Sequence, residues 1–455
     1  MRHLTPDFLT EISGGRAVYP SDIGSREVTA ITTDSRRVSE GGLFIPLKGE
    51  RADGHTFIKH VMEKGALLVL TEREDAAEGL AHITVASTEE ALRTIAAAYL
   101  KEMAVPVVGI TGSVGKTSTK ETIAAVLGQK FRTLKTRGNF NNEIGLPLTV
   151  FDLRDEHEIA VLEMGISHFG DMKVLGEIAH PDIAVITNIG TCHLEYLVDR
   201  DGVFREKTDM FTYLKSDGRA VLNGDDDKLR AVESVRGRRP VFFGLGENND
   251  YRAENITPRG LKGISCRIVT PDGSFEVTVP IPGEHMVLNA LAACAVGRLC
   301  GLANEEIKAG IESLKPLGGR FNIIETPYVT VVDDCYNANP MSMKASVKLL
   351  ASAEGRRVAI LGDMAELGAD EMELHREVGR FMKNYAPDLL ITAGPKAALI
   401  AEEAGTIRSE VFPDMEAVKK ALPDLVGKGD TVLVKASHCM HFEELVSALT
   451  QARSL

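Results

Sequence analysis

The most constraining feature of the sequence is residues 107–120, VVGITGSVGKTSTK, where a strand pattern, a glycine-rich turn and a helical pattern follow one another directly. The β-branched run over residues 105–110 is typical of a buried parallel strand. The helical pattern begins at Lys116 and runs to about residue 130. Backbone N–H groups at such a turn and helix start surround a phosphate group. The sequence therefore predicts a phosphate-binding loop on an α/β sheet.

This loop is a shortened form of the pattern G-x-x-x-x-G-K-[ST], because Ile110 stands where the full pattern has glycine. We expect Lys116 to reach the β- and γ-phosphates of a nucleotide and the Thr117 hydroxyl to bind Mg²⁺. An ordinary glycine-rich turn between a strand and a helix is the alternative. The residues expected around the phosphates are Thr111, Gly112, Ser113, Val114, Gly115, Lys116, Thr117 and Ser118.

Length and charge limit the class of protein. A chain of 455 residues is too long for one ordinary core, so two or three domains are expected. The net charge of −13 argues against a nucleic-acid partner. The N-terminus lacks the apolar core of a signal peptide, and the longest apolar run, residues 287–303, predicts a buried helix rather than membrane insertion. The six scattered cysteines favour reduced thiols in the cytoplasm.

Strand and helix patterns alternate along most of the chain, which predicts the α/β class with three domains. We expect an N-terminal α/β domain over residues 1–104, a central domain with a mostly parallel sheet and the phosphate loop over 105–316, and a Rossmann-like α/β domain over 317–455. Residues 250–282 differ, because short alternating strands flank a Pro-Asp-Gly turn, as in an antiparallel hairpin. Breaks near residues 105 and 316 are expected to act as free hinges.

Polar residues follow two predicted strands of the central domain. Glu163 ends a buried strand, where its carboxylate needs either a cation such as Mg²⁺ or a hydrogen-bond partner. His193 follows another strand, and a structural, hydrogen-bonded histidine is the alternative to a metal ligand. Because ligands of open α/β sheets lie beyond the carboxyl ends of the strands, both side chains are expected near the nucleotide. The asparagine-rich segment 139–147 is a second polar loop, with a simple turn as the alternative.

Taken together, these motifs resemble the Mur ligase family of ATP-dependent, amide-forming enzymes of peptidoglycan precursor synthesis. The matching segments are TGSVGKT at 111–117, NFNNEIGLP at 139–147, EMG at 163–165, TNIGTCHLE at 187–195, GGR at 318–320 and DDCYNANP at 333–340. The last of these and LGDMAELG at 361–368 resemble the family member that adds D-Ala-D-Ala to UDP-MurNAc-tripeptide. The resemblance covers residues 34–438, which is essentially the whole chain.

The resemblance implies a nucleotide and metal site. Thr117 and Glu163 would bind one Mg²⁺, and His193 would help to bind a second. Lys207 would be carbamylated by CO₂ and would then present oxygen ligands to Mg²⁺; an exposed helix lysine is the alternative. Lys116, Lys207 and His193 are thus the expected catalytic residues. The remaining nucleotide contacts would be Asn289 at the adenine, Arg320 at the γ-phosphate and Asp334 at the ribose.

The resemblance also implies where the substrates bind. Ser35 and Arg36 would contact the uracil or diphosphate of UDP-MurNAc-tripeptide, with a capped turn as the alternative. Further residues expected at the substrates are Asn141, Asn142, Tyr336, Asn337 and Asn339. His438 stands where an arginine is frequent in this type of ligase, which weakens any assignment of a fixed positive charge there.

The implied reaction uses ATP to convert the tripeptide carboxylate into an acyl phosphate, which the amine of D-Ala-D-Ala then attacks. Domain closure around ATP is expected to exclude water, and nothing in the sequence demands more than a monomer. Two alternatives remain. One is a Mur-like or folylpolyglutamate-synthetase-like ligase for a different amine, and the other is a nucleotide-binding protein that has lost catalysis.

Overall fold

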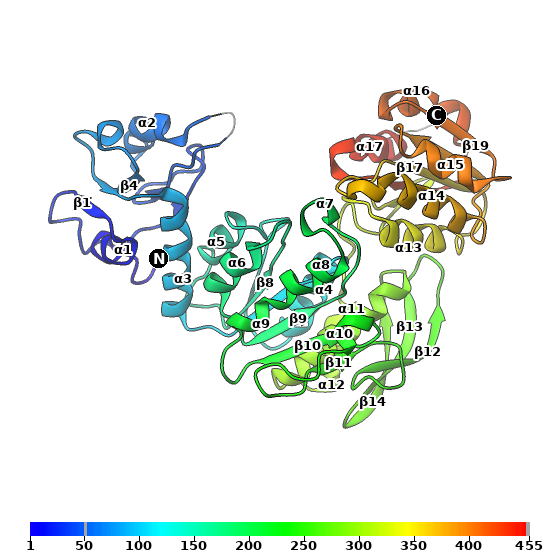
Figure 1. Cartoon of the computed structure of the whole chain (residues 1–455), viewed down its shortest axis with the longest axis horizontal. Coiled ribbons are helices and arrows are strands. Elements are labelled where there is room, and N and C mark those ends of the chain that lie inside the picture. Colours follow the sequence, from blue (N-terminus) through cyan, green and yellow to red (C-terminus); the bar gives the residue numbers. More distant parts are fainter. Residues whose placement is uncertain (50–51, 452–455) are drawn as a thin grey trace.

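The protein folds into three α/β domains that follow one another along an extended molecule, as a computed structural model of residues 1–49 and 52–451 shows (Figure 1). The first domain lies at one end, the central domain in the middle and the third domain at the other end. The α/β class and the three-domain architecture are therefore confirmed. The predicted divisions after residues 104 and 316 fall between α3 and β6 and between α12 and β15.

The first domain contains a five-stranded sheet in the order β1-β5-β4-β3-β2. Only β1 is antiparallel to its neighbour, whereas the other pairs are parallel. The strands are short, and the most deeply buried of them is β4. The elements are α1 (Pro6–Ser13), β1 (Arg16–Val18), β2 (Ile31–Thr32), β3 (Leu43–Phe44), α2 (Ile58–Glu63), β4 (Leu68–Thr71), β5 (His82–Thr84) and α3 (Thr88–Met103).

The central domain is built on a six-stranded parallel sheet in the order β11-β10-β9-β6-β8-β7. Because β6 has β9 on one side and β8 on the other, the loop after β6 lies where the strand order reverses, the usual ligand position in open α/β sheets. The strands are β6 (Val107–Thr111), β7 (Thr133–Lys135), β8 (Ile159–Glu163), β9 (Ile183–Ile186), β10 (Arg219–Asn223) and β11 (Val241–Phe243).

Helices cover both faces of this sheet. One face packs against α4 and α11, whose apolar residues continue into the antiparallel sheet described next. The other face packs against α5, α6 and α9. The helices are α4 (Lys116–Leu127), α5 (Gly145–Val150), α6 (Asp171–Ala179), α7 (Leu194–Leu197), α8 (Arg200–Thr208), α9 (Met210–Tyr213), α10 (Asp227–Arg230), α11 (Glu284–Leu299) and α12 (Asn304–Glu312).

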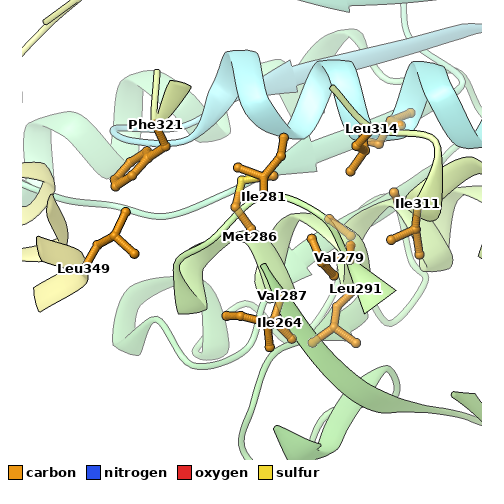
Figure 2. Packing of buried hydrophobic residues seen from close by; sticks show 14 of the residues in the cluster. Ile264, Val279, Ile281, Met286, Val287, Leu291, Ile311, Leu314, Phe321 and Leu349 are labelled. Carbon is orange, nitrogen blue, oxygen red and sulfur yellow. The ribbon is translucent and has the colours of Figure 1, made fainter. Parts of the chain in front are cut away.

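A three-stranded antiparallel sheet, β12 (Arg252–Pro258), β13 (Ile264–Thr270) and β14 (Gly273–Val279), extends from the central domain. Its predicted hairpin is confirmed, with Pro271 and Asp272 in the turn between β13 and β14. Figure 2 shows Ile264 and Val279 of this sheet beside Val287 and Leu291 of α11. The sheet is therefore held to the domain by apolar packing on α11.

The third domain has a six-stranded sheet in the order β15-β16-β20-β17-β18-β19, parallel except for the β15–β16 pair. Its strands are β15 (Asn322–Glu325), β16 (Thr330–Asp333), β17 (Arg357–Gly362), β18 (Leu389–Ala393), β19 (Ser409–Phe412) and β20 (Thr431–Lys435). Its helices are α13 (Pro340–Leu350), α14 (Glu371–Met382), α15 (Ala398–Ala404), α16 (Met415–Leu425) and α17 (Glu443–Gln451).

The connection near residue 105 is a packed joint. The buried face of α3 lies on α5 and α6 of the central domain, and the Tyr99 hydroxyl donates a hydrogen bond to the Leu153 carbonyl at 2.9 Å. The expectation of a free hinge there does not match this packing, because α3 contributes to the core on one face of the central sheet. Within the described residues, no helix is long and apolar enough to cross a membrane, and α11 is the buried helix expected from the apolar run.

Candidate active site

A cleft of about 540 Å³ lies between the carboxyl ends of the central strands and the third domain. The central domain contributes the phosphate loop, the asparagine-rich loop, Glu163 and His193. The third domain and its connection contribute Gly319–Phe321, the segment after β16, and Lys435 at the end of β20. The sequence predicted that these strand ends would face the nucleotide, and the fold brings them to one cavity of the size that holds a small-molecule substrate.

The phosphate loop needs glycine at two positions. Gly112 has φ +150°, and a Cβ there would overlap the Thr187 hydroxyl. Gly115 has φ +85° and immediately precedes α4. Ile110, by contrast, is fully buried within β6, so the missing glycine of the full motif is a strand position and leaves the loop intact.

Thr187 and Asn188, at the end of β9, hold the phosphate loop in place. The Asn188 amide oxygen accepts a hydrogen bond from Val114 N–H at 2.9 Å, and the Thr187 hydroxyl donates to the Val114 carbonyl at 2.6 Å. The Lys116 ammonium donates to the Gly112 carbonyl at 2.8 Å, folding back over its own loop. Sequence reasoning missed this clamp, although the polar pair after a buried strand was visible.

Glu163 lies at the end of β8 and is almost completely buried. Its Oε1 accepts hydrogen bonds from the Thr117 hydroxyl at 3.0 Å and from the Asn141 amide at 2.8 Å. Its Oε2 has no hydrogen-bond partner among the described residues. The structure thus brings Thr117, Glu163 and Asn141 together at one wall of the cleft and leaves a buried carboxylate oxygen free to accept a further ligand.

Lys120 is a further buried residue of this wall that sequence reasoning missed. Its ammonium donates to the Thr136 carbonyl at 2.7 Å and lies 3.7 Å from Glu163 Oε2. Thr136 in turn accepts a hydrogen bond from Glu163 N–H through its hydroxyl. The only signal was a lysine on α4 one turn after Thr117, on a helix that is buried along most of its length. Lys120 therefore supplies a fixed positive charge beside the carboxylate.

His193 also lines the cleft, immediately before α7. Its Nδ1 is 2.8 Å from Oε2 of Glu366, a residue of the segment that follows β17 in the third domain. Both residues have positive φ, +53° for His193 and +60° for Glu366. Strain of this kind at non-glycine residues concentrates at functional sites. Glu366 therefore contacts the central domain from the third domain, which gives one residue of the 361–368 motif a structural role.

Lys207 is fully buried on α8, so the alternative of an exposed helix lysine is wrong. Its Nζ has no hydrogen-bond partner within the described parts of the chain. Burial lowers the pKa of the Lys207 amine from 10.5 to about 8, with a smaller contribution from the nearby Lys116 charge. An amine in this position is partly neutral near physiological pH. In residues 1–49 and 52–451, no three His, Cys, Asp or Glu side chains converge as a ready-made metal cluster.

The third domain presents a charged pair and an aromatic residue to the cleft. Asp334 is buried, and its Oδ2 accepts hydrogen bonds from Lys435 Nζ and from the Ser346 hydroxyl, both at 2.6 Å. The Arg320 guanidinium lies over the Tyr336 ring, 4.2 Å from its centroid. Asn337 also lines the cleft. Asn339 lines it too but caps α13, because its side chain accepts a hydrogen bond from Ser342 N–H.

Three other predicted residues, Asn142, Asn289 and Arg36, make hydrogen bonds within the protein, and Ser35 lies beside Arg36. The Asn142 amide oxygen accepts a hydrogen bond from Gly145 N–H at the start of α5, and Asn289 accepts a hydrogen bond from the Thr119 hydroxyl while lying behind the phosphate loop. Ser35 and Arg36 lie in the first domain, away from the cleft, where Asp34 accepts hydrogen bonds from the backbone and guanidinium of Arg36. This is the capped turn that the sequence left open. Part of the neighbouring segment 49–55 lies outside the described residues.

The cleft combines a phosphate loop, a buried carboxylate and a strand-end histidine, and a second α/β domain faces them. This arrangement fits an ATP-dependent ligase. Three family models match the chain: "Mur ligase family, catalytic domain" over residues 27–111, "Mur ligase middle domain" over 110–297 and "Mur ligase, glutamate ligase domain" over 319–438. The chain belongs to the Mur ligase family.

Three named relatives match nearly the whole chain. The UDP-N-acetylmuramoyl-tripeptide–D-alanyl-D-alanine ligase of Bacillus subtilis is 40% identical over 93% of this chain and 94% of its own length. The crystal structure of MurF from Acinetobacter baumannii superimposes with a TM-score of 0.91 at 33% identity, covering 98% of each chain. MurF of Thermotoga maritima, solved with ADP, has a TM-score of 0.84 at 33% identity over 93% of this chain and 97% of its own.

Proposed function

We propose that this chain is a UDP-N-acetylmuramoyl-tripeptide–D-alanyl-D-alanine ligase that uses ATP to form an amide bond in peptidoglycan precursor synthesis. The observation that carries the proposal is the identity of 40% over nearly the whole length of a relative with that name. The geometry agrees, because the phosphate loop and Glu163 face Tyr336 and Asn337 of the third domain across one cleft.

The reaction proceeds in two steps. A carboxylate oxygen of the tripeptide attacks the γ-phosphorus of ATP, and ADP leaves, which gives an acyl phosphate. The amine of D-Ala-D-Ala then attacks the carbonyl carbon, the tetrahedral intermediate expels phosphate, and the nitrogen loses a proton. Lys116 and the loop N–H groups hold the β- and γ-phosphates, while Arg320 stabilises the charge on the transferred group. Asp334 holds the ribose, and Asn289 is the proposed adenine contact.

The donor set at Glu163 fits Mg²⁺. The Thr117 hydroxyl and the free Oε2 of buried Glu163 are oxygen ligands, which this hard cation prefers. His193, which lines the same cleft, would contribute to a second ion. When bound, Mg²⁺ neutralises the charge that grows on the transferred phosphoryl group. Lys120 and Asn141 keep the Glu163 side chain directed into the cleft.

Carbamylation of Lys207 is the second part of the proposal. The neutral amine would add to CO₂, forming an N–C bond and releasing one proton, and the carbamate oxygens would be suitable ligands for Mg²⁺. Burial without a hydrogen-bond partner supports this step, because it favours the neutral amine. In ¹³C NMR, protein equilibrated with ¹³C-bicarbonate should give a carbamate signal that Lys207→Ala lacks. If both proteins give the same spectrum, Lys207 is not carbamylated.

The proposed substrate contacts lie in two places, the first domain and the cleft. We propose that Ser35 and Arg36 of the first domain contact the UDP portion, and that Asn141, Asn142, Tyr336, Asn337 and Asn339 lie near the peptide and the incoming dipeptide. We further propose a monomer that works in the cytoplasm, in agreement with the six unpaired cysteines.

Phosphate release tests the activity directly. The protein is incubated with ATP and Mg²⁺, together with either UDP-MurNAc-tripeptide and D-Ala-D-Ala, UDP-MurNAc-tripeptide and glutamate, or folate and glutamate. Release that depends on both UDP-MurNAc-tripeptide and D-Ala-D-Ala is expected, with Lys116→Met as the inactive control. Phosphate release with glutamate and folate, but not with D-Ala-D-Ala, would refute the proposed function in favour of a folylpolyglutamate-synthetase-like ligase.

A further inference from the structure

Tyr336 links two side chains at the edge of the cleft. The Arg320 guanidinium lies 4.2 Å from the centroid of the Tyr336 ring. The His438 ring is stacked on the same tyrosine, with centroids 5.4 Å apart and planes 24° apart. His438 comes from the short 3₁₀ turn after β20, whereas Arg320 belongs to the connection between the central and third domains. Three distant segments therefore meet at one aromatic ring.

The tyrosine is the main anchor of the Arg320 side chain. Across residues 1–49 and 52–451, the guanidinium makes no ion pair or side-chain hydrogen bond, and it lies against the face of the tyrosine ring. The backbone reinforces this arrangement, because Tyr336 N–H donates to the Gly319 carbonyl at 3.0 Å, directly before Arg320. Gly319 N–H in turn donates to the Asp333 carboxylate at 2.7 Å. The position of the ring thus determines where the guanidinium lies.

We propose that His438 is a positioning residue that acts through Tyr336 to direct Arg320 at the terminal phosphate of a bound nucleoside triphosphate. His438 is exposed and does not line the cleft, so it acts on the nucleotide only through the tyrosine. Stacking limits the rotation of the Tyr336 ring, and the ring face holds the cation. This inference rests on the proposed function, because it takes the Arg320 contact with the γ-phosphate from there.

The position of Arg320 gives the inference a selective readout. A guanidinium aimed at the γ-phosphate adds affinity for a triphosphate but not for ADP. Losing the stack should therefore weaken binding of a non-hydrolysable ATP analogue by about 3- to 10-fold, the range expected for one aromatic pair. Affinity for ADP should stay the same. A residue that merely stabilised the fold would change both affinities together, or neither.

Isothermal titration calorimetry with Mg²⁺ and each nucleotide provides the test. His438→Ala should lose affinity for the ATP analogue alone, and Arg320→Ala should show the same selectivity. His438→Phe keeps a stacking ring and should bind both nucleotides as the unaltered protein does. His441→Ala is the control for the same turn, because His441 pairs with Glu443 and its ring lies 6.4 Å from that of His438 rather than against Tyr336.

Two results would overturn the inference. One is an equal loss of affinity for ADP and the ATP analogue in His438→Ala, and the other is unchanged binding of both in a correctly folded variant. Because the readout is nucleotide binding, it is separate from the substrate test. Absence of D-Ala-D-Ala-dependent phosphate release would refute the proposed function, whereas the selectivity of His438→Ala would still be measurable.

Discussion

Replacing Lys207 by methionine should stabilise the protein while abolishing its proposed activity. The amine is fully buried without a hydrogen-bond partner, and burial lowers its pKa from 10.5 to about 8. That difference corresponds to about 3 kcal/mol of unfavourable free energy for keeping the charged form inside the folded protein. Methionine has a similar length and no charge, so Lys207→Met should gain up to about 3 kcal/mol near neutral pH.

The stability gained by Lys207→Met depends on pH, because the pKa of Lys207 is lower in the folded protein than in the unfolded chain. Because the folded protein binds the Lys207 proton more weakly than the unfolded chain does, the stability of the unaltered protein rises as pH increases from about 8 to 10.5. The advantage of Lys207→Met should therefore be greatest below pH 8 and should shrink as pH approaches 10.5. Urea unfolding in CO₂-free buffer without metal, at pH values from 7 to 10, measures this difference.

Lys173→Met is the matched control, because Lys173 lies exposed on α6 of the same domain. That substitution should change the free energy of unfolding by no more than about 0.5 kcal/mol at any pH. If Lys207→Met is no more stable than the unaltered protein at pH 7, or if its advantage does not decrease with pH, the buried amine is not the destabilising group that the structure indicates.

Three further substitutions probe other parts of the molecule. Gly112→Ala places a Cβ against the Thr187 hydroxyl at φ +150°, so nucleotide affinity measured by calorimetry should fall by about tenfold or more, and unchanged affinity would contradict the loop geometry. Glu163→Gln should weaken ADP binding by about tenfold or more only when Mg²⁺ is present; equal loss with and without Mg²⁺ would remove Glu163 from the metal site. Burial alone would raise the pKa of Glu72, but hydrogen bonds, first from Lys48, lower it to about 2 from its ordinary 4.5. Because the Lys48 side chain is 58% exposed, solvent screens this pair, so Glu72→Gln should lose only about 1 kcal/mol of stability at pH 7; denaturant titration should find the loss shrinking as pH falls from 4.5 to 2, and a loss that did not change with pH would contradict this reasoning.

The interior strands of the large sheets could be predicted from the sequence, whereas the edge strands could not. The runs around β6, β8, β9 and β20 are apolar because these strands are covered on both sides, and that pattern survives in the sequence. The edge strands β7, β11, β15 and β19 are short and partly exposed. Their residues are mixed in polarity, and only pairing with a neighbouring strand makes them extended.

The candidate site divides in the same way. The phosphate loop could be found from local sequence, because a strand followed by glycines and Lys116-Thr117 is typical of phosphate binding. Glu163 could be found because an acid at the end of a buried strand needs a cation or a hydrogen-bond partner. The roles of Lys120 and Glu366 could not, since each depends on a partner far along the chain, Glu163 for one and His193 for the other. Whether a lysine is exposed or buried depends on which helix face meets the core.

The sequence alone determined the α/β class, the three-domain organisation, the phosphate loop and the resemblance to the ligase family. Each of these depends only on local periodicity or on short motifs. The tertiary structure alone decided that Lys207 is buried and unpaired, that Ser35 and Arg36 lie in a capped turn away from the cleft, and that His438 reaches Tyr336. The physical reason is that pKa shifts, burial and side-chain contacts depend on distances between residues that only folding brings together.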